Sequence, residues 1–201
     1  MSSLDPAGRP ASAAGETGLA YPFAPAPEPG EAVEVVPGVH WARLPLAGAL
    51  RHINVWLLED AGGWTLVDTG LNAPEPRAAW EGPLHEYLRG RPLHRIICTH
   101  HHPDHAGLAT WLQQRYGCAI WMTAAAEAVM RRLERTWYDE AWREARLASY
   151  AAEGLPVTPE LRQFMIVETY RRAMSGIPER IARHVADGEI LEIGAYRWKA
   201  R

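Results

Sequence analysis

The chain has 201 residues, of which 47% are hydrophobic, with a formal net charge of −3 and a sequence pI near 6.3. This length and hydrophobic content allow one domain with a sizeable core and an added segment. The weak charge gives no electrostatic basis for binding nucleic acid or anionic lipid, and no apolar run is long enough to span a bilayer. We therefore expect no nucleic-acid partner and no membrane segment, while the oligomeric state stays open.

The first thirty residues are rich in Ala, Pro, Gly and Ser and contain no apolar core of the kind that a signal peptide needs. We interpret residues 1–30 as a disordered arm. The alternation of Pro25, Pro27 and Pro29 leaves open a polyproline-type ligand for a partner, beside a plain tail that packs on the domain. The two cysteines, Cys98 and Cys118, argue against a disulfide framework, and we expect a cytoplasmic protein.

Strand-like patterns begin after this arm. β-Branched and aromatic residues recur in four short runs that Gly- and Pro-containing turns separate. The predicted strands cover residues 33–36, 39–46, 53–59 and 64–68. Short turns of this kind connect antiparallel neighbours, so the pattern predicts an antiparallel sheet that opens the domain.

Helices and strands alternate in the next part of the chain. A helix is expected over residues 75–88 with an interruption near Gly82, and a buried strand follows over residues 93–98. Leu108, Trp111 and Leu112 form the apolar side of a short helix over residues 104–114, which Gly117 ends. The next strand is predicted at residues 119–122. The order of elements is typical of an α/β fold.

The loop between the strand at residues 93–98 and the following helix concentrates metal-binding side chains. Four of the nine histidines lie between residues 100 and 105, together with Asp104. His100 and His102 share one side of an extended segment, whereas Asp104 and His105 fall in the first helical turn. Imidazole and carboxylate are ligands for zinc and also suit iron or manganese. Four ligands from one short loop fit two adjacent ions better than one.

The order His100-x-His102-x-Asp104-His105, followed by Ala106 and Gly107, resembles the signature of the metallo-β-lactamase-fold hydrolases. The resemblance extends upstream to residues 54–58 and to residues 66–70, which are similar to two core strands of that family and its Asp-Thr-Gly turn. It implies an α/β fold in which residues 31–123 form the N-terminal half of an αββα sandwich. The second half of that sandwich is expected to be largely missing from this chain.

The resemblance also implies a mechanism. Two zinc ions, with iron or manganese as alternatives, would share a hydroxide that attacks the substrate. His100 and His102 would bind the first ion, and Asp104 and His105 the second. Asp104 is the expected catalytic residue because it would also orient the nucleophile. Asp68 would brace the histidine loop, although an aspartate that only caps a turn is an open alternative.

The substrate is expected to be a small-molecule ester or thioester. The histidine directly after Asp104, His105, makes the motif similar to that of the glyoxalase-II-like thioesterases, the lactonases and the related nucleases of this fold. The missing basic patch argues against the nuclease. An iron-dependent sulfur dioxygenase on the same fold stays open as an alternative.

Residues 124–187 have a mostly helical pattern, with helices predicted at residues 125–137, 140–152, 159–174 and 178–185. In the resembled family such an insertion lies beside the metal pocket, which suggests a lid. Its aromatic and Met side chains would either touch substrate or simply pack between helices. The residues concerned are Tyr138, Trp142, Tyr150, Met165 and Tyr170.

Residues 188–201 alternate as a strand and are expected to start the next part of the core. In the resembled family such a strand leads to a third histidine, a bridging aspartate and a last histidine. None of these is present, and His184 on a predicted helix is not expected to be a ligand. We therefore expect a truncated chain, and a catalytically incomplete metal-binding fragment is the alternative to an enzyme.

Overall fold

The computed structural model describes residues 23, 25–47, 50–136, 139–164 and 172–201. Most of the arm expected over residues 1–30 lies outside this range. Local periodicity predicted nearly all of the strands that form. The strands in the described residues are β1 (Ala32–Val36), β2 (Val39–Pro45), β3 (His52–Asp60), β4 (Gly63–Val67), β5 (Leu93–Ile97), β6 (Ala119–Met122), β7 (Arg183–His184), β8 (Ile190–Ile193) and β9 (Tyr196–Lys199).

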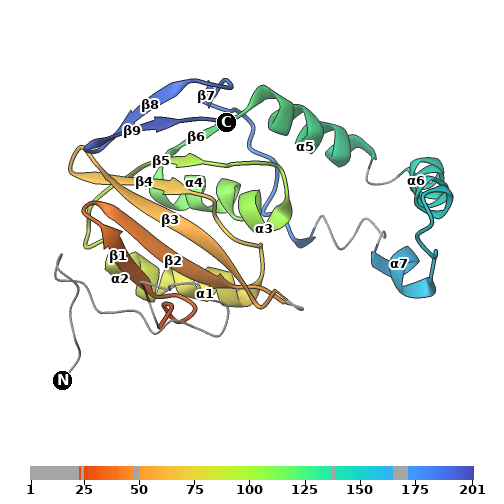
Figure 1. Cartoon of the computed structure of the whole chain (residues 1–201), viewed down its shortest axis with the longest axis horizontal. Helices are drawn as coiled ribbons and strands as arrows, with labels where there is room; N and C mark the ends of the chain where they lie inside the picture. The colour runs from red at the N-terminus through yellow and green to blue at the C-terminus, as the bar shows by residue number, and fades with distance from the viewer. Residues whose placement is uncertain (1–22, 24, 48–49, 137–138, 165–171) are drawn as a thin grey trace, which may run out of the picture.

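Helices connect the parallel strands and form a separate group after β6 (Figure 1). Gly82 divides the first helical region, and Pro83 begins the second helix there, as the sequence predicted. The helices are α1 (Pro74–Glu81), α2 (Pro83–Tyr87), α3 (Pro103–Ala106), α4 (Ala109–Tyr116), α5 (Ala124–Thr136), α6 (Glu140–Ala152) and α7 (Pro159–Phe164).

Seven strands form one mixed sheet in the order β1-β2-β3-β4-β5-β6-β7. The first four are antiparallel neighbours, as the short turns predicted, whereas β4, β5, β6 and β7 run parallel. Val67 at the end of β4 is paired with Ile97 at the end of β5. The loops that follow these two strands therefore leave from the same edge of the sheet.

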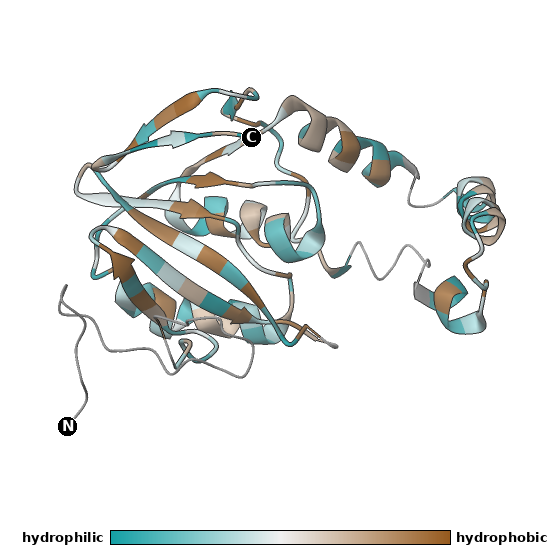
Figure 2. Cartoon of the chain, in the orientation of Figure 1, coloured by the Kyte–Doolittle hydropathy of each residue, from teal (hydrophilic) through white to brown (hydrophobic). Residues whose placement is uncertain are grey.

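One face of the sheet carries the main hydrophobic core. Alternate strand residues such as Leu57, Leu66 and Ile96 are fully buried against α1, α2 and α4, which supply Trp80 and Leu112 among others. Figure 2 shows hydrophobic positions recurring between hydrophilic ones along the strands. The helices α1, α2 and α4 thus form a layer that covers this face of the sheet.

The opposite face begins a second layer. β8 and β9 form a two-stranded hairpin, and Leu191 and Ile193 pack with Val39 and Leu58 of the large sheet. Gly194 lies so close to the Glu59 carbonyl that a Cβ would have no room there. Residues 188–201, expected to start the next part of the core, thus form a hairpin that folds back on the sheet.

Two predicted helices form differently. The helix expected over residues 104–114 is split into α3 and α4, because the Leu108 amide donates to Gly70 O at 3.1 Å instead of continuing the helical pattern. The prediction of a helix over residues 178–185 is wrong. This segment contains β7, whose flanking amides Ala182 and Val185 each donate to β6 carbonyls at 2.9 Å. Pairing with a distant strand overrides the local helical spacing.

The helices α5, α6 and α7 extend beyond the edge of the sheet (Figure 1). Trp142 and Tyr150 are half-buried on α6, whereas Tyr138, Met165 and Tyr170 lie outside the described residues. The helix expected over residues 159–174 is seen only as α7, since residues 165–171 also lie outside. Within the described ranges, none of the helices combines the length and apolarity needed to cross a membrane.

Candidate metal centre

The histidine loop, residues 99–105, lies at the carboxyl end of β5 beside the turn that follows β4. The amide of Asp68 donates to Ile97 O at 3.0 Å, which extends the β4–β5 pairing to the first residue after the strand. Cys98 is paired in the same way with β6, through a 2.9 Å bond to Trp121 O. Hydrogen bonds to the neighbouring segments on both sides thus hold the backbone from which the histidine loop begins.

Asp68 is the centre of the contacts that hold this loop. Its side chain is buried, and its backbone has a φ of +63°, a left-handed conformation that aspartate tolerates better than most residues. The Thr99 amide donates to Asp68 Oδ1 at 2.8 Å, and His105 Nδ1 donates to Asp68 Oδ2 at 2.7 Å. Asp68 thus serves its own turn and contacts the histidine loop at the same time.

Three of the predicted ligands bring their imidazole rings together. The ring centroid of His100 is 4.0 Å from that of His105 and 4.6 Å from that of His102. The fourth ring, that of His101, is 6.2 Å from His100 and 4.8 Å from His102. His105 Nε2 lies 3.5 Å from Asp104 Oδ2. The four predicted ligands, His100, His102, Asp104 and His105, are thus neighbours within the loop, and two of the three predicted imidazole rings lie beside that of His100.

Hydrogen bonding decides which ring nitrogens are free. Thr99 has one hydroxyl proton, and Asp68 can only accept, so Thr99 Oγ1 donates to Asp68 Oδ2 at 2.8 Å. Thr99 Oγ1 is then the acceptor for His100 Nδ1, which is 3.0 Å away. His100 and His105 both use Nδ1 in this network, and both keep Nε2 as the donor atom for a ligand. Such partners on the second nitrogen are typical of metal-binding histidines.

The protonation of the rings follows from the same contacts. Burial lowers the pKa of His100, and the neighbouring His105 and His102 rings lower it further, so His100 is neutral near pH 7. Burial also acts to lower the pKa of His105. The hydrogen bond and charge of Asp68, with the charge of Asp104, outweigh burial and raise the His105 pKa. The raised pKa means that a proton competes more strongly with a cation for His105 Nε2 than it would at an ordinary histidine.

The donor set can be compared with what a metal requires. Neutral imidazole and carboxylate are suitable for zinc, iron or manganese, and the engaged Nδ1 atoms leave Nε2 atoms available. Within the described part of the chain, however, no three His, Cys, Asp or Glu side chains are grouped so that they could hold one ion. The chemical types of these donors suit a divalent metal, but fewer than three of them are grouped around one point in the described residues.

Sequence reasoning missed one residue of this region. Thr69 was treated as part of a turn, yet its amide and hydroxyl donate to His105 O at 2.7 and 2.8 Å. Its Oγ1 also accepts from the Leu108 amide at 3.1 Å. The position of Thr69 after a strand was the available signal, but the partner 36 residues away could not be read from it.

Four histidines outside the loop have partners elsewhere in the structure. His184 lies on β7 and contacts Glu127 at 2.5 Å, at an exposed position. Three others contact residues of the strands and of the helix layer: His40 Nδ1 is 2.8 Å from Tyr87 Oη, and His52 Nδ1 is 2.6 Å from an Arg43 nitrogen. His85 contacts Tyr116 Oη at 3.1 Å.

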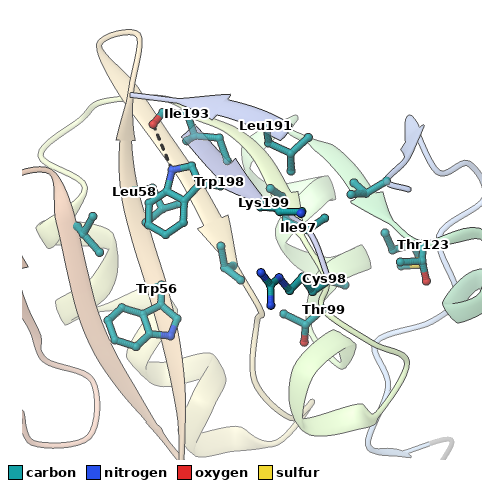
Figure 3. A pocket seen from close by; sticks show the side chains of 16 residues that line it. Trp56, Leu58, Ile97, Cys98, Thr99, Thr123, Leu191, Ile193, Trp198 and Lys199 are labelled. Atoms are coloured by element: carbon teal, nitrogen blue, oxygen red, sulfur yellow. Dashed lines mark hydrogen bonds between the residues drawn. The ribbon is translucent and has the colours of Figure 1, made fainter. Parts of the chain in front are cut away.

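A cavity of about 430 Å³ lies between the sheet and the β8–β9 hairpin, next to the histidine loop. Figure 3 shows Trp56 and Ile97 on the sheet side and Trp198 on the hairpin side, and Thr99 of the histidine loop also lines the cavity. Most of the lining is apolar. The polar and charged groups of the lining come from Thr99, Thr123, Lys199 and Arg201.

Comparison with known proteins identifies the relatives of this chain. The sequence model of the metallo-beta-lactamase superfamily matches residues 48–192. The chain is also 42% identical over 69 residues to a hydroxyacylglutathione hydrolase of Thiobacillus denitrificans, a match that covers 33% of this chain and 23% of that protein.

Solved structures share the fold over a longer stretch. A beta-lactamase domain protein from Burkholderia ambifaria is 35% identical, with a TM-score of 0.71, over 89% of this chain and 50% of that one. A metallo-beta-lactamase family protein from Thermus thermophilus is 30% identical, with a TM-score of 0.61, over 83% and 52%. The chain thus spans about half the length of these solved relatives, and the predicted half of an α/β sandwich is confirmed.

Proposed function

The chain belongs to the metallo-beta-lactamase superfamily, and we propose that it acts in a metal-dependent hydrolase that cleaves a small-molecule ester or thioester. The observation that carries the proposal is the geometry of the histidine loop. His100 and His105 present Nε2 because Asp68 and Thr99 engage their Nδ1 atoms. His105 Nε2 in turn lies 3.5 Å from the Asp104 carboxylate.

In this proposal His100 and His102 would hold one zinc ion, and Asp104 and His105 would hold a second. Iron or manganese is the alternative metal. When bound, such ions would supply a water molecule of lowered pKa and a positive charge for the substrate oxygen. Asp104 is the proposed catalytic residue, since its carboxylate lies beside His105 Nε2 and can orient a polar group there. Asp68 fixes the ring of His105 directly and that of His100 through Thr99.

The thioester substrate class is supported by the match to the hydroxyacylglutathione hydrolase, whose name specifies an acyl group carried on a thiol. The matched stretch is 69 residues long, too short to assign the acyl group. The formal net charge of −3 gives no support to a nucleic-acid substrate. A small acyl thioester is therefore the substrate class that we propose.

The test combines metal content with turnover. Purified protein is analysed for bound zinc, iron and manganese and is then assayed for thiol release from a simple acyl thioester. Replacement of His102 by alanine is expected to lower bound metal and to reduce turnover at least about 100-fold, because a ligand is lost. His184→Ala is the matched control, since His184 lies on β7 with Glu127 as its partner, and it should leave both quantities unchanged.

A second candidate function is metal binding without turnover. It is favoured by the finding that no three donors meet at one point among the residues that the structure describes. Metal that binds weakly, is lost in His102→Ala and supports no thiol release would favour this second function. Protein that binds no metal at any concentration would contradict both.

A further inference from the structure

The loop that follows the Asp68 turn is bonded to a segment a hundred residues further along the chain. We call residues 172–176 the return segment, because they bring the chain back to the core after α7. The amide of Asn72 donates to Ala173 O at 3.0 Å. Asn72 Nδ2 donates to Arg172 O at 2.8 Å and to Met174 O at 3.0 Å. One asparagine therefore satisfies three successive carbonyl groups of the return segment.

The amide of Asn72 is itself held in one orientation. Arg77, one turn into the helix layer, donates from Nε to Asn72 Oδ1 at 2.8 Å. With the oxygen accepting from Arg77, both Nδ2 hydrogens face the return segment and both are used. An asparagine that merely formed a turn would bond to its own neighbouring backbone. This one has its partners 100 and 102 residues away.

The other side of the return segment is bonded to the base of the histidine loop. The Ser175 amide donates to Gly107 O at 2.7 Å, directly after α3, and Ser175 Oγ accepts from the Trp111 amide at 3.2 Å. Thr110 Oγ1 donates to Gly176 O at 2.9 Å. The return segment thus lies between the Asn72 loop and the junction of α3 and α4.

The three backbones meet at Gly107 with no space between them. A Cβ on Gly107 would be 2.6 Å from Ala173 O and 2.8 Å from Gly70 O, and it would clash with Pro103 O. Gly107 follows α3, the helix that carries Asp104 and His105. A displacement of the return segment would therefore also shift α3 and the two proposed ligands on it.

We infer that Asn72 is a positioning residue that ties the end of the helical segment α5–α7 to the histidine loop. Asn72 touches none of the proposed metal ligands. It acts by holding the return segment, which in turn supports the α3–α4 junction and fixes where the helical segment rejoins the core. The inference goes beyond the proposed function, and only its kinetic test rests on that function.

Hydrogen exchange of single amides tests the inference without any assay of turnover. In Asn72→Ala, the Ser175 amide is expected to exchange at least about tenfold faster, since the segment that carries it loses its bonds to Asn72. Leu57 and Leu66, buried in β3 and β4, should keep their exchange rates. Asn72→Asp keeps the size but replaces the donor with an acceptor facing two carbonyl oxygens, so it should accelerate Ser175 at least as much.

Two further variants complete the design. Asn54→Ala is the matched control: Asn54 is the chain's other asparagine, and it is exposed and accepts from Trp41 Nε1 at 2.9 Å. It should leave Ser175 exchange unchanged. Arg77→Met keeps the aliphatic stem but frees the Asn72 amide to rotate, and it should give an intermediate acceleration. Arg77→Met also keeps the test available if the Asn72 variants fold poorly.

The kinetic arm uses zinc-loaded protein and an acyl thioester. If the helical segment borders the substrate, Asn72→Ala should raise KM several-fold with kcat within about twofold, because positioning is disturbed while the ligands stay. Wild-type protein without turnover would contradict the proposed function and leave the exchange result standing. Ser175 exchange that is unchanged in Asn72→Ala, or that rises equally in Leu57 and Leu66, would overturn the inference.

Discussion

Asp68 shows how one side chain can serve the local backbone and a distant loop together. The sequence left two roles open, a turn residue or a brace for the histidines. The left-handed φ of +63° suits the turn, while the same carboxylate accepts from Thr99 and His105. Both roles are filled because the end of β4 lies beside the end of β5.

Replacing Asp68 by asparagine tests its contribution to metal binding. Asparagine tolerates the left-handed backbone but removes the charge and one acceptor, so His105 loses the partner that fixes its Nδ1. We expect zinc or cobalt affinity to fall about 10- to 100-fold, measured by competition with a chromophoric chelator. Asp187→Asn, at an exposed position, is the control. Equal affinity of wild type and Asp68→Asn would show that the contact does not support the ligands.

His40 is a buried titratable residue away from the histidine loop. Its Nδ1 lies 2.8 Å from Tyr87 Oη, and its Nε2 is 4.0 Å from one carboxylate oxygen each of Glu34 and Glu59. Burial lowers the pKa of His40 below its ordinary value of 6.5, although the two carboxylates oppose the shift. Nearby arginines add to the lowering. His40 is therefore held neutral by the fold.

This shift predicts a pH dependence of stability. Between the lowered pKa and 6.5, the unfolded chain binds a proton at His40 that the folded chain does not. The free energy of unfolding should therefore decrease as the pH falls from 6.5 through this range. Urea unfolding of wild type and His40→Gln at a series of pH values measures the effect. The variant should lose less stability on acidification than wild type, and parallel curves would contradict the assignment to His40.

Among the elements, the α3–α4 break was the consequential difference from the predicted structure. Periodicity favoured one helix over residues 104–114 because Leu108, Trp111 and Leu112 share a face. The Leu108 amide instead bonds to Gly70 O and to Thr69 Oγ1. These partners come from the turn after β4, so the helix is divided where the histidine loop is anchored to the sheet.

Gly107→Ala should therefore destabilise the protein strongly. Gly107 has helical angles that alanine accepts, but the added Cβ would clash with three backbone carbonyls. We expect a loss of about 2–4 kcal/mol in the free energy of unfolding, measured in urea. The contrasting control is Gly117→Ala, where φ is +66° and a Cβ meets open space. That variant should cost only about 1 kcal/mol. A smaller loss in Gly107→Ala than in Gly117→Ala would contradict the close packing.

At the scale of the whole molecule, the sheet is covered unequally on its two faces. The helix layer buries one face, whereas the other face packs against the β8–β9 hairpin and Val185 and retains the cavity of about 430 Å³. Trp56, on this second face, is 36% exposed. Solved relatives about twice as long share the same fold. The chain on its own thus presents an apolar surface beside the histidine loop.

An apolar dye should detect this surface. We expect a naphthalene-sulfonate probe to bind the protein in the folded state, because contiguous apolar surface with a cavity takes up such probes. Trp56→Ser should reduce the fluorescence enhancement by at least about half. Leu50→Ser is the control, since Leu50 is a more exposed apolar residue, at 70%, that does not line the cavity. Equal enhancement in the two variants would argue against binding in the cavity.

Much of the fold and the candidate site was determined by local sequence. Strand alternation, the glycines in turns and the division at Gly82 depend on neighbouring residues, and the strands predicted from β1 to β6 are confirmed. The predicted superfamily is confirmed as well. The four proposed ligands fall within six positions, so their type and spacing could be read directly. Their role as metal ligands stays a prediction.

Only the tertiary structure decided the contacts between distant segments. β7 forms because β6 offers carbonyl groups to a stretch with helical spacing, and α3 ends where Gly70 takes the Leu108 amide. Asn72 has its three backbone acceptors about a hundred positions away. Hydrogen bonds of this kind depend on how the chain returns to the sheet. Periodicity and spacing carry no information about that return, because they describe residues only a few positions apart.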